Sequence, residues 1–214
     1  MYGIKSMTVI SDKEIQDTLR PYGFSPDGGQ RAAIRAYISL LLRWNQKISL
    51  TTVVDPLEML RFHFGESIFA AFSVPIEKGR LADVGSGAGF PGLALGVVLP
   101  TLSITWIESN SKKAAFLAEV ARELNLPHVE VLRKRFEEAP GKLGEFDYVT
   151  ARALGNYGDL LGWSRGALSD SGQVVLWLGE AECRRISADP SFTWRDPLLI
   201  PGSKRRFVLV GAPG

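Results

Sequence analysis

The sequence predicts an α/β fold in which a helical cap, residues 10–75, precedes a mostly parallel sheet that ends in an antiparallel hairpin. Helix-start signals dominate the chain before about residue 80. After that point, short β-like runs alternate with helical segments, which is typical of a parallel sheet with crossover helices. The last two β-like runs have no helix between them, so they are expected to pair directly. The chain of 214 residues fits a single domain, 1–214, made of the cap and a core at 76–214.

The cap is predicted from helix-start patterns and from one apolar stripe. The stripe lies between residues 30 and 44, where apolar side chains recur at helical spacing. Serine or aspartate at a helix N-cap, with proline or glutamate in the first turn, marks a start. The candidate starts are Ser11 with Glu14, Ser25 with Pro26, and Asp55 with Pro56 and Glu58. We therefore expect three or four helices, with Trp44 in their core.

The core elements follow in order after the cap. The expected strands are Arg80–Val84, Leu102–Ile107, Val129–Leu132, Phe146–Thr150 and Val174–Leu178. The expected helices are Pro91–Leu99, Lys112–Leu124 and Tyr157–Leu168. The expected hairpin joins runs around Phe192–Ile200 and Arg206–Val210 through the turn at 201–204.

Composition excludes several classes of protein. The formal net charge of +2 is too small for a polybasic protein, although it leaves room for a local basic patch. A single cysteine, Cys183, excludes an internal disulfide and a multi-cysteine zinc site, and with two histidines we expect no metal cofactor. Residues 1–14 lack the apolar core of a signal peptide, and no apolar run approaches membrane-spanning length. We expect a cytoplasmic protein without a membrane partner.

The segment LADVGSGAGFPG, residues 81–92, predicts a ligand-binding loop. Its glycines follow a strand and precede a helix, where they permit tight turns and bring exposed backbone N–H groups close to a ligand. Glu108 ends the next strand, and a carboxylate there can accept hydrogen bonds from ribose hydroxyls. Strand, glycine loop, helix, strand and acid coincide within about 30 residues, which is more specific than a glycine-rich turn alone.

The loop is compatible with two classes of cofactor. Residues 87–92 also satisfy the G-x-G-x-x-G pattern of nicotinamide and flavin sites. Asp83 weighs against these, because a fixed negative charge beside the loop disfavours a pyrophosphate and favours a cationic ligand. S-adenosylmethionine carries an ammonium and a sulfonium group, and D-x-G-x-G-x-G resembles the loop of class I methyltransferases.

Longer motifs make the resemblance more specific. The segments LADVGSGAGFPGLALGVVLP, IESNSKKAAFLAEVARELNL, RKRFEE and FDYVTARAL, with WNQKISLTTVVDPLEMLRFHFGESI upstream, resemble the bacterial 16S rRNA guanine-N7 methyltransferases, also called glucose-inhibited division protein B. The resemblance covers roughly residues 40–180. It implies a Rossmann-like class I methyltransferase fold, with a seven-stranded sheet. It also implies methyl transfer from S-adenosylmethionine to guanine N7 in 16S rRNA or the small ribosomal subunit.

The resemblance also implies which residues form the sites. Those expected at the cofactor are Asp83, Gly85, Ser86, Gly87, Gly89, Phe90, Glu108, Phe136, Glu137 and Arg152. The resemblance also places Asn45 and His63 at RNA, whereas Arg133, Lys134, Lys204, Arg205 and Arg206 are expected there because basic clusters can contact phosphates. Two positions depart from the family pattern. Leu178 stands where the family usually has lysine, and Glu66 stands where it has aspartate.

The expected chemistry needs no catalytic base. N7 of guanine presents an in-plane lone pair, so placement of nucleophile and methyl group in line is sufficient. Cys183 has no activating pattern around it, and the (Asp/Asn)-Pro-Pro-aromatic motif of adenine methylation is absent after the fourth strand. Arg152, the candidate catalytic residue, either orients guanine through O6 or pairs with the cofactor carboxylate. We favour an orienting role, because a cation does not stabilise a developing positive charge on N7.

Several alternatives stay open at this point. The basic clusters either contact phosphates or are ordinary solvated surface, and His63 is either a packing residue or an RNA contact. The function alternatives are methylation of another RNA site or of a small molecule, nicotinamide-dependent oxidation, and RNA binding without catalysis. A monomer is expected.

Overall fold

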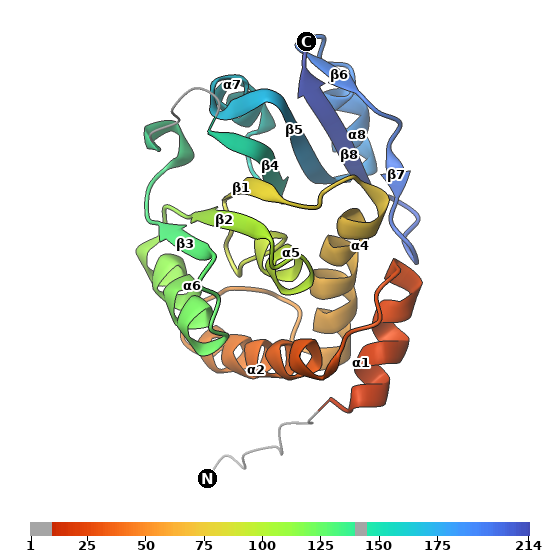
Figure 1. The fold of residues 1–214 in the computed structure, drawn as a ribbon, viewed down its shortest axis with the longest axis vertical. Helices are drawn as coiled ribbons and strands as arrows, with labels where there is room; N and C mark the ends of the chain where they lie inside the picture. Colours follow the sequence, from red (N-terminus) through yellow and green to blue (C-terminus); the bar gives the residue numbers. More distant parts are fainter. Residues whose placement is uncertain (1–9, 140–144) are drawn as a thin grey trace.

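A mixed sheet forms the centre of the molecule in this computed structural model, which describes residues 10–139 and 145–214 (Figure 1). The strand order is β3-β2-β1-β4-β5-β8-β6, with β7 pairing beside β6 on β8. The five strands β3, β2, β1, β4 and β5 are parallel, whereas β8 is antiparallel to β5, β6 and β7. The strands are β1 (Gly79–Val84), β2 (Leu102–Ile107), β3 (Val129–Leu132), β4 (Phe146–Arg152), β5 (Leu168–Gly179), β6 (Phe192–Trp194), β7 (Leu198–Leu199) and β8 (Arg206–Pro213). The predicted parallel sheet with an antiparallel C-terminal end is confirmed, and the two-residue β7 adds an eighth strand to the expected seven.

Two cores lie on opposite faces of the sheet, so the described chain has three layers. Along β5, Val175 and Trp177 belong to one core while Val174 and Leu176 belong to the other, as the two-residue period of a strand requires. The first core is shared with α5 (Gly92–Val98), α6 (Ser111–Glu123) and the N-terminal helices (Figure 1). The second is closed by α7 (Tyr157–Ala167) and α8 (Glu180–Ile186).

The N-terminal helices pack against the first face of the sheet. They are α1 (Asp12–Leu19), η1 (Arg20–Tyr22), α2 (Gly28–Asn45), α3 (Pro56–Met59), η2 (Leu60–Gly65) and α4 (Glu66–Ser73). Tyr37 of α2 donates its hydroxyl proton to the carbonyl oxygen of Ala88, which ties the helices directly to the glycine-rich loop. Trp44 is partly buried and packs edge-on against Phe116 of α6.

Some local predictions need correction. The predicted N-cap at Ser25 is wrong, because Asp27 caps α2 by accepting a hydrogen bond from the backbone N–H of Gln30. The caps at Ser11 and Asp55 are confirmed. Helix α8 was not predicted, and β5 begins six residues earlier than expected, at Leu168. Residues 1–9, which form most of the segment used to exclude a signal peptide, lie outside the described part of the chain.

Candidate active site

The glycine-rich loop connects β1 to α5 in a conformation that side chains rarely adopt. Gly85, Gly87 and Gly89 have φ values of +68°, +56° and +98°. A Cβ atom on Gly85 would lie 2.9 Å from Cδ1 of Leu154, so this glycine also permits close packing on the segment after β4. The backbone N–H groups of Gly85 and Ser86 donate to the carbonyl oxygen of Ile107, which fixes the loop against the end of β2. The loop is therefore built as the sequence predicts.

Asp83 lies beneath this loop and has no exposed surface. Its carboxyl accepts hydrogen bonds from the backbone N–H of Gly92 at 3.1 Å and the hydroxyl of Thr150 at 2.9 Å. Burial raises its pKa to about 7, and the nearby Glu108 acts in the same direction. The expected fixed negative charge needs correction, because the side chain positions the loop from below and is partly protonated at neutral pH.

Glu108 follows β2 and has its carboxylate oriented by backbone groups. Oε2 accepts from the N–H of Gly87 at 2.9 Å, and Oε1 accepts from the N–H of Asn110 at 2.7 Å. Each carboxylate oxygen keeps a second lone pair that can accept a ribose hydroxyl. Glu108 is buried, with 7% of the residue exposed, so its carboxylate is held in a fixed orientation beside the loop.

The remaining predicted cofactor residues occupy two different environments. Phe90 is buried, with its ring edge-on to Tyr37 and Phe64 and stacked on His63 at 5.1 Å. Phe136 packs edge-on against Trp163. Ser86 is buried and donates its hydroxyl proton to the carbonyl oxygen of Asp83 at 2.7 Å. Phe90 and Ser86 thus shape the loop from inside.

Glu137 lies at the surface beside Phe136. It forms an ion pair with Arg135 at 3.3 Å and is 38% exposed. Phe136 and Glu137 share the short helix η3 (Phe136–Glu138), which follows β3 and packs against Trp163 of α7. This helix places an aromatic ring and an acid next to each other in the chain.

These residues fit S-adenosylmethionine. Gly85 is exposed and Gly87 is partly exposed, so a ligand can reach the loop backbone, and Glu108 offers an oriented carboxylate for the ribose. Glu108, Gly87 and Phe136 would hold the cofactor by these groups.

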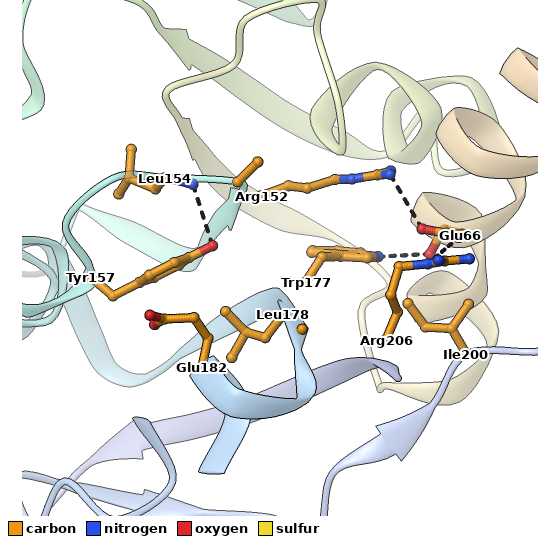
Figure 2. A pocket seen from close by; sticks show the side chains of 11 residues that line it. Glu66, Arg152, Leu154, Tyr157, Trp177, Leu178, Glu182, Ile200 and Arg206 are labelled. Carbon is orange, nitrogen blue, oxygen red and sulfur yellow. Dashed lines mark hydrogen bonds and ion pairs between the residues drawn. The ribbon is translucent and has the colours of Figure 1, made fainter. Parts of the chain in front are cut away.

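A cavity of about 310 Å³ lies at the ends of β4 and β5 (Figure 2). It is lined by Glu66, Arg152, Ala153, Leu154, Tyr157, Trp177, Leu178, Gly179, Glu182, Ile200 and Arg206. Leu154 both lines this cavity and faces Gly85, so the cavity adjoins the glycine-rich loop. Its volume lies at the lower end of the range for small-ligand sites, about 300–1,000 Å³.

Arg152 reaches across this cavity to the N-terminal helices. Nη1 donates to the carbonyl oxygen of Phe62 at 2.7 Å, and Nη2 pairs with Glu66 at 3.2 Å. Burial lowers the pKa of the guanidinium, and Glu66 opposes that shift. Arg152 therefore has a specified orientation, with donors left over for a ligand.

Glu66 joins three distant segments at one end of the cavity. Its carboxylate pairs with Arg152 and, at 2.7 Å, with Arg206 of β8, while its backbone carbonyl accepts from Trp177 Nε1 at 2.7 Å. Glu66 is 2% exposed, and burial raises its pKa while the two arginines counteract the rise. Sequence reasoning noted Glu66 only as a departure from a motif and placed Arg206 in a surface cluster. Both belong to the cavity.

The chain leaves β4 in a strained conformation beside this cavity. Ala153 has a φ of +53°, which is unusual for a residue other than glycine. The N–H of Leu154 donates to the Tyr157 hydroxyl at 3.4 Å, which helps to hold the turn. Such strain is concentrated at functional sites, so the turn supports a site here.

Asn45 and His63, both predicted at RNA, organise the loop after α2. The Asn45 amide donates to the carbonyl oxygen of Thr51 and accepts from the N–H groups of Leu50 and Thr51. His63 Nε2 lies 2.9 Å from the Thr51 hydroxyl. Burial lowers the pKa of His63 to about 4, with help from Arg152, so the ring is neutral at pH 7. Within the described chain these contacts are structural.

The basic residues predicted at RNA fall into two groups. Arg206 is bound in the cavity, as described above. Arg133, Lys134, Lys204 and Arg205 are all exposed. None of the four forms an ion pair with another described residue. These four cations are available to an anionic ligand.

Cys183 is buried on α8, and burial raises the pKa of its thiol. A thiol in this state is a poor nucleophile. Residues 10–139 and 145–214 contain no group of three or more His, Cys, Asp or Glu side chains arranged to hold a metal ion. Nor does this part of the chain contain a helix with the length and apolarity that a membrane crossing requires.

Solved structures share the fold. A SAM dependent methyltransferase from Aquifex aeolicus superposes with a TM-score of 0.61 at 16% identity, covering 73% of this chain and 93% of that chain. A ribosomal protein L11 methylase from Lactobacillus delbrueckii subsp. bulgaricus gives 0.59 at 18% identity, covering 72% and 79%. At these identities the likeness establishes the class I methyltransferase fold and says nothing of the substrate.

Sequence comparison is more specific. The Ribosomal RNA small subunit methyltransferase G of Xanthomonas campestris pv. campestris (strain B100) is 36% identical over 192 residues, covering 87% of this chain and 89% of that protein. The protein of the same name from Stutzerimonas stutzeri (strain A1501) is 36% identical over 212 residues, covering 95% and 98%. A sequence model of the family rRNA small subunit methyltransferase G matches residues 30–193. The chain therefore belongs to the rRNA small subunit methyltransferase G family.

Proposed function

We propose that this protein transfers a methyl group from S-adenosylmethionine to N7 of a guanine in 16S rRNA. The observation that carries the proposal is the junction at Leu154, where the glycine-rich loop with its oriented Glu108 adjoins the cavity of about 310 Å³. Membership of the rRNA small subunit methyltransferase G family supports the same activity and an rRNA acceptor.

The residues of the site suit a reaction that needs no proton removal. When bound, S-adenosylmethionine supplies an electrophilic methyl group on a sulfonium centre. Guanine N7 has a free lone pair, so the protein has to orient the acceptor and exclude water, and positioning alone can lower a barrier by about 7–11 kcal/mol. His63 is hydrogen-bonded to Thr51 and the Cys183 thiol is buried, so neither side chain is placed as a base or nucleophile.

Arg152 orients the acceptor in this proposal. Its guanidinium is held by Phe62 and Glu66 on the side of the N-terminal helices, which favours the cavity over a role at the cofactor carboxylate. Its remaining N–H groups can donate to guanine O6, an acceptor next to N7. A cation does not stabilise positive charge on N7, so Arg152 acts by placement.

We also propose the setting in which the enzyme works. It acts as a monomer in the cytoplasm on 16S rRNA or the small ribosomal subunit. The cap at 10–75 and the core at 76–214 form one domain, because Glu66 and Tyr37 connect them through buried polar contacts. The predicted cations Arg133, Lys134, Lys204 and Arg205 supply phosphate contacts.

Radiolabelled methyl transfer tests the proposal. Purified 30S subunits, 50S subunits and naked 16S rRNA are incubated with the enzyme and labelled S-adenosylmethionine, and the modified base is mapped. We expect label at guanine N7 of 16S rRNA and none in 50S subunits. Label at an exocyclic or ribose position would contradict the N7 assignment. A thermal shift with S-adenosylmethionine but not with NAD is expected in parallel.

A further inference from the structure

The cavity of about 310 Å³ at the ends of β4 and β5 is called the acceptor cavity below, and it has a negative end and a positive end. Glu182 of α8 lies beneath the ring of Tyr157, whereas the guanidiniums of Arg152 and Arg206 gather around Glu66 at the other end (Figure 2). Burial raises the pKa of the Tyr157 hydroxyl, and the charge of Glu182 adds to the rise, so the two groups share one electrostatic environment. Between the ends, Leu154 and Leu178 supply apolar walls.

Guanine is complementary to this arrangement, because its hydrogen-bond donors and acceptors lie on different edges. Its Watson–Crick edge carries two adjacent donors, N1–H and the 2-amino group, and the neighbouring Hoogsteen edge carries the acceptors O6 and N7. A carboxylate can accept two parallel hydrogen bonds from such a donor pair, and charge-assisted bonds of this kind are strong. Adenine has no N1–H donor, and inosine lacks the 2-amino group.

We propose that Glu182 selects guanine by accepting hydrogen bonds from N1–H and the 2-amino group of the acceptor base. The inference rests on the proposed function, because it concerns the base that enters the cavity for N7 methylation. With the donor edge at Glu182, the edge that carries O6 and N7 faces away from α8. This leaves O6 accessible to a guanidinium and leaves the N7 lone pair unoccupied.

The position of Glu182 suits this role. Oε2 pairs with Arg185 at 2.7 Å, and Oε1 takes no hydrogen bond from any residue that the structure describes, so Oε1 is available to a donor of the base. The Glu182 side chain is 46% exposed, so its replacement leaves the core intact. The helix that carries it directly follows Gly179, close to the Leu178 departure from the family pattern.

The same helix offers a matched control. Glu180 pairs with Arg184 at 2.6 Å and is 39% exposed, but it does not line the cavity. Glu182→Gln and Glu180→Gln each remove one charge from the same turn of α8. Only Glu182→Gln removes a carboxylate from the acceptor cavity.

The test compares acceptors that carry guanine or inosine at the mapped position of 16S rRNA. For the wild type, we expect kcat/KM to be about 10–100-fold higher for guanine, the effect of one hydrogen bond to a charged group. In Glu182→Gln the ratio should fall to within about threefold of unity, because an amide cannot accept both bonds. Glu180→Gln should keep the wild-type ratio. Single-turnover rates and thermal melting accompany each measurement.

An unchanged guanine-to-inosine ratio in folded Glu182→Gln would overturn the inference. So would complete loss of guanine methylation in that variant, because reading the donor edge contributes selectivity rather than chemistry. Failure of the wild-type enzyme to methylate any guanine N7 would instead contradict the proposed function. The two failures are therefore distinguishable in one set of reactions.

Discussion

Asp83 carries its proton to higher pH in the folded protein than in the unfolded chain. Its pKa is raised from 3.8 to about 7, chiefly by burial. Folding therefore binds a proton between these values, and the stabilising contribution of the neutral carboxyl is lost as pH rises through about 7. We expect the melting temperature of Asp83→Asn to rise relative to that of the wild type between pH 5 and pH 8, because only the wild type loses this contribution. Circular dichroism melts across this range measure the difference.

Asp159→Asn is the control for that experiment. It removes an exposed carboxylate from α7 and reports how much of the pH trend comes from net charge alone. If the melting temperatures of Asp83→Asn and the wild type differ by the same amount at pH 5 and pH 8, the buried carboxyl does not titrate in this window.

Arg152 is the residue whose loss should affect turnover most. Arg152→Ala removes the donors that face the cavity while Glu66 keeps its second partner, Arg206. Because misplacement of a reactant costs about 100-fold, we expect the single-turnover rate to fall at least that far with the fold retained. Arg35→Ala, which breaks an ion pair with Asp12 away from the cavity, should leave the rate unchanged. An unchanged rate in folded Arg152→Ala would remove this residue from the site.

At the scale of elements, Ser25 and Asp27 are the two candidate N-caps of α2. Asp27 forms a reciprocal capping box with Gln30, with hydrogen bonds of 2.8 and 3.0 Å, whereas Ser25 lies outside the helix. Asp27→Ala should lower the free energy of unfolding by about 1 kcal/mol. Ser25→Ala should lower it by less than half of that. Urea denaturation measures both, and equal losses would contradict the assigned cap.

Elements with strong local patterns were predictable from the sequence. The strand bounds of β2 and β3 match the expected ones, because alternating or continuous apolar runs flanked by turns specify short strands. Helix α8 was missed because it has only seven residues and buries just Cys183 and Ile186, too few for a visible period. Tertiary pairings were not predictable either. Glu66 lies 86 residues from Arg152 and 140 from Arg206, and no local pattern specifies such contacts.

The residues of the candidate site also divide into those that the sequence predicts and those that only the structure reveals. The glycine loop and Glu108 were identified because a strand, a turn and a terminal acid follow one another closely in the chain. The pattern did not indicate that the Asp83 carboxyl is directed into the core, since burial depends on Thr150 of the neighbouring strand. Glu182 carries no motif at all, and only the cavity reveals it.

For the whole molecule, the distribution of charge matters more than the sum of +2. Many arginines are already paired with carboxylates, including Arg135, Arg184 and Arg185. Lys204 and Arg205 stand in the turn before β8, and no described carboxylate pairs with them. Arg206, the first residue of β8, lines the cavity, so these two cations lie next to it in the chain and are placed to contact the phosphates of RNA bound there.

Reversing both charges should therefore reduce the salt dependence of RNA binding. Each lost phosphate contact lowers the slope of log K against log salt by about 0.7–0.9, so Lys204→Glu with Arg205→Glu should lower it by roughly 1.5. Lys112→Glu with Arg122→Glu on α6 changes net charge equally on an element that does not line the cavity, and it should change the slope much less. Filter binding of 16S rRNA is measured between about 50 and 200 mM salt. Over this interval the affinity should fall by about 10-fold or more, which is enough to compare the slopes. Equal slopes for the two double variants would mean that the turn before β8 contributes only overall charge, because a specific phosphate contact depends on position.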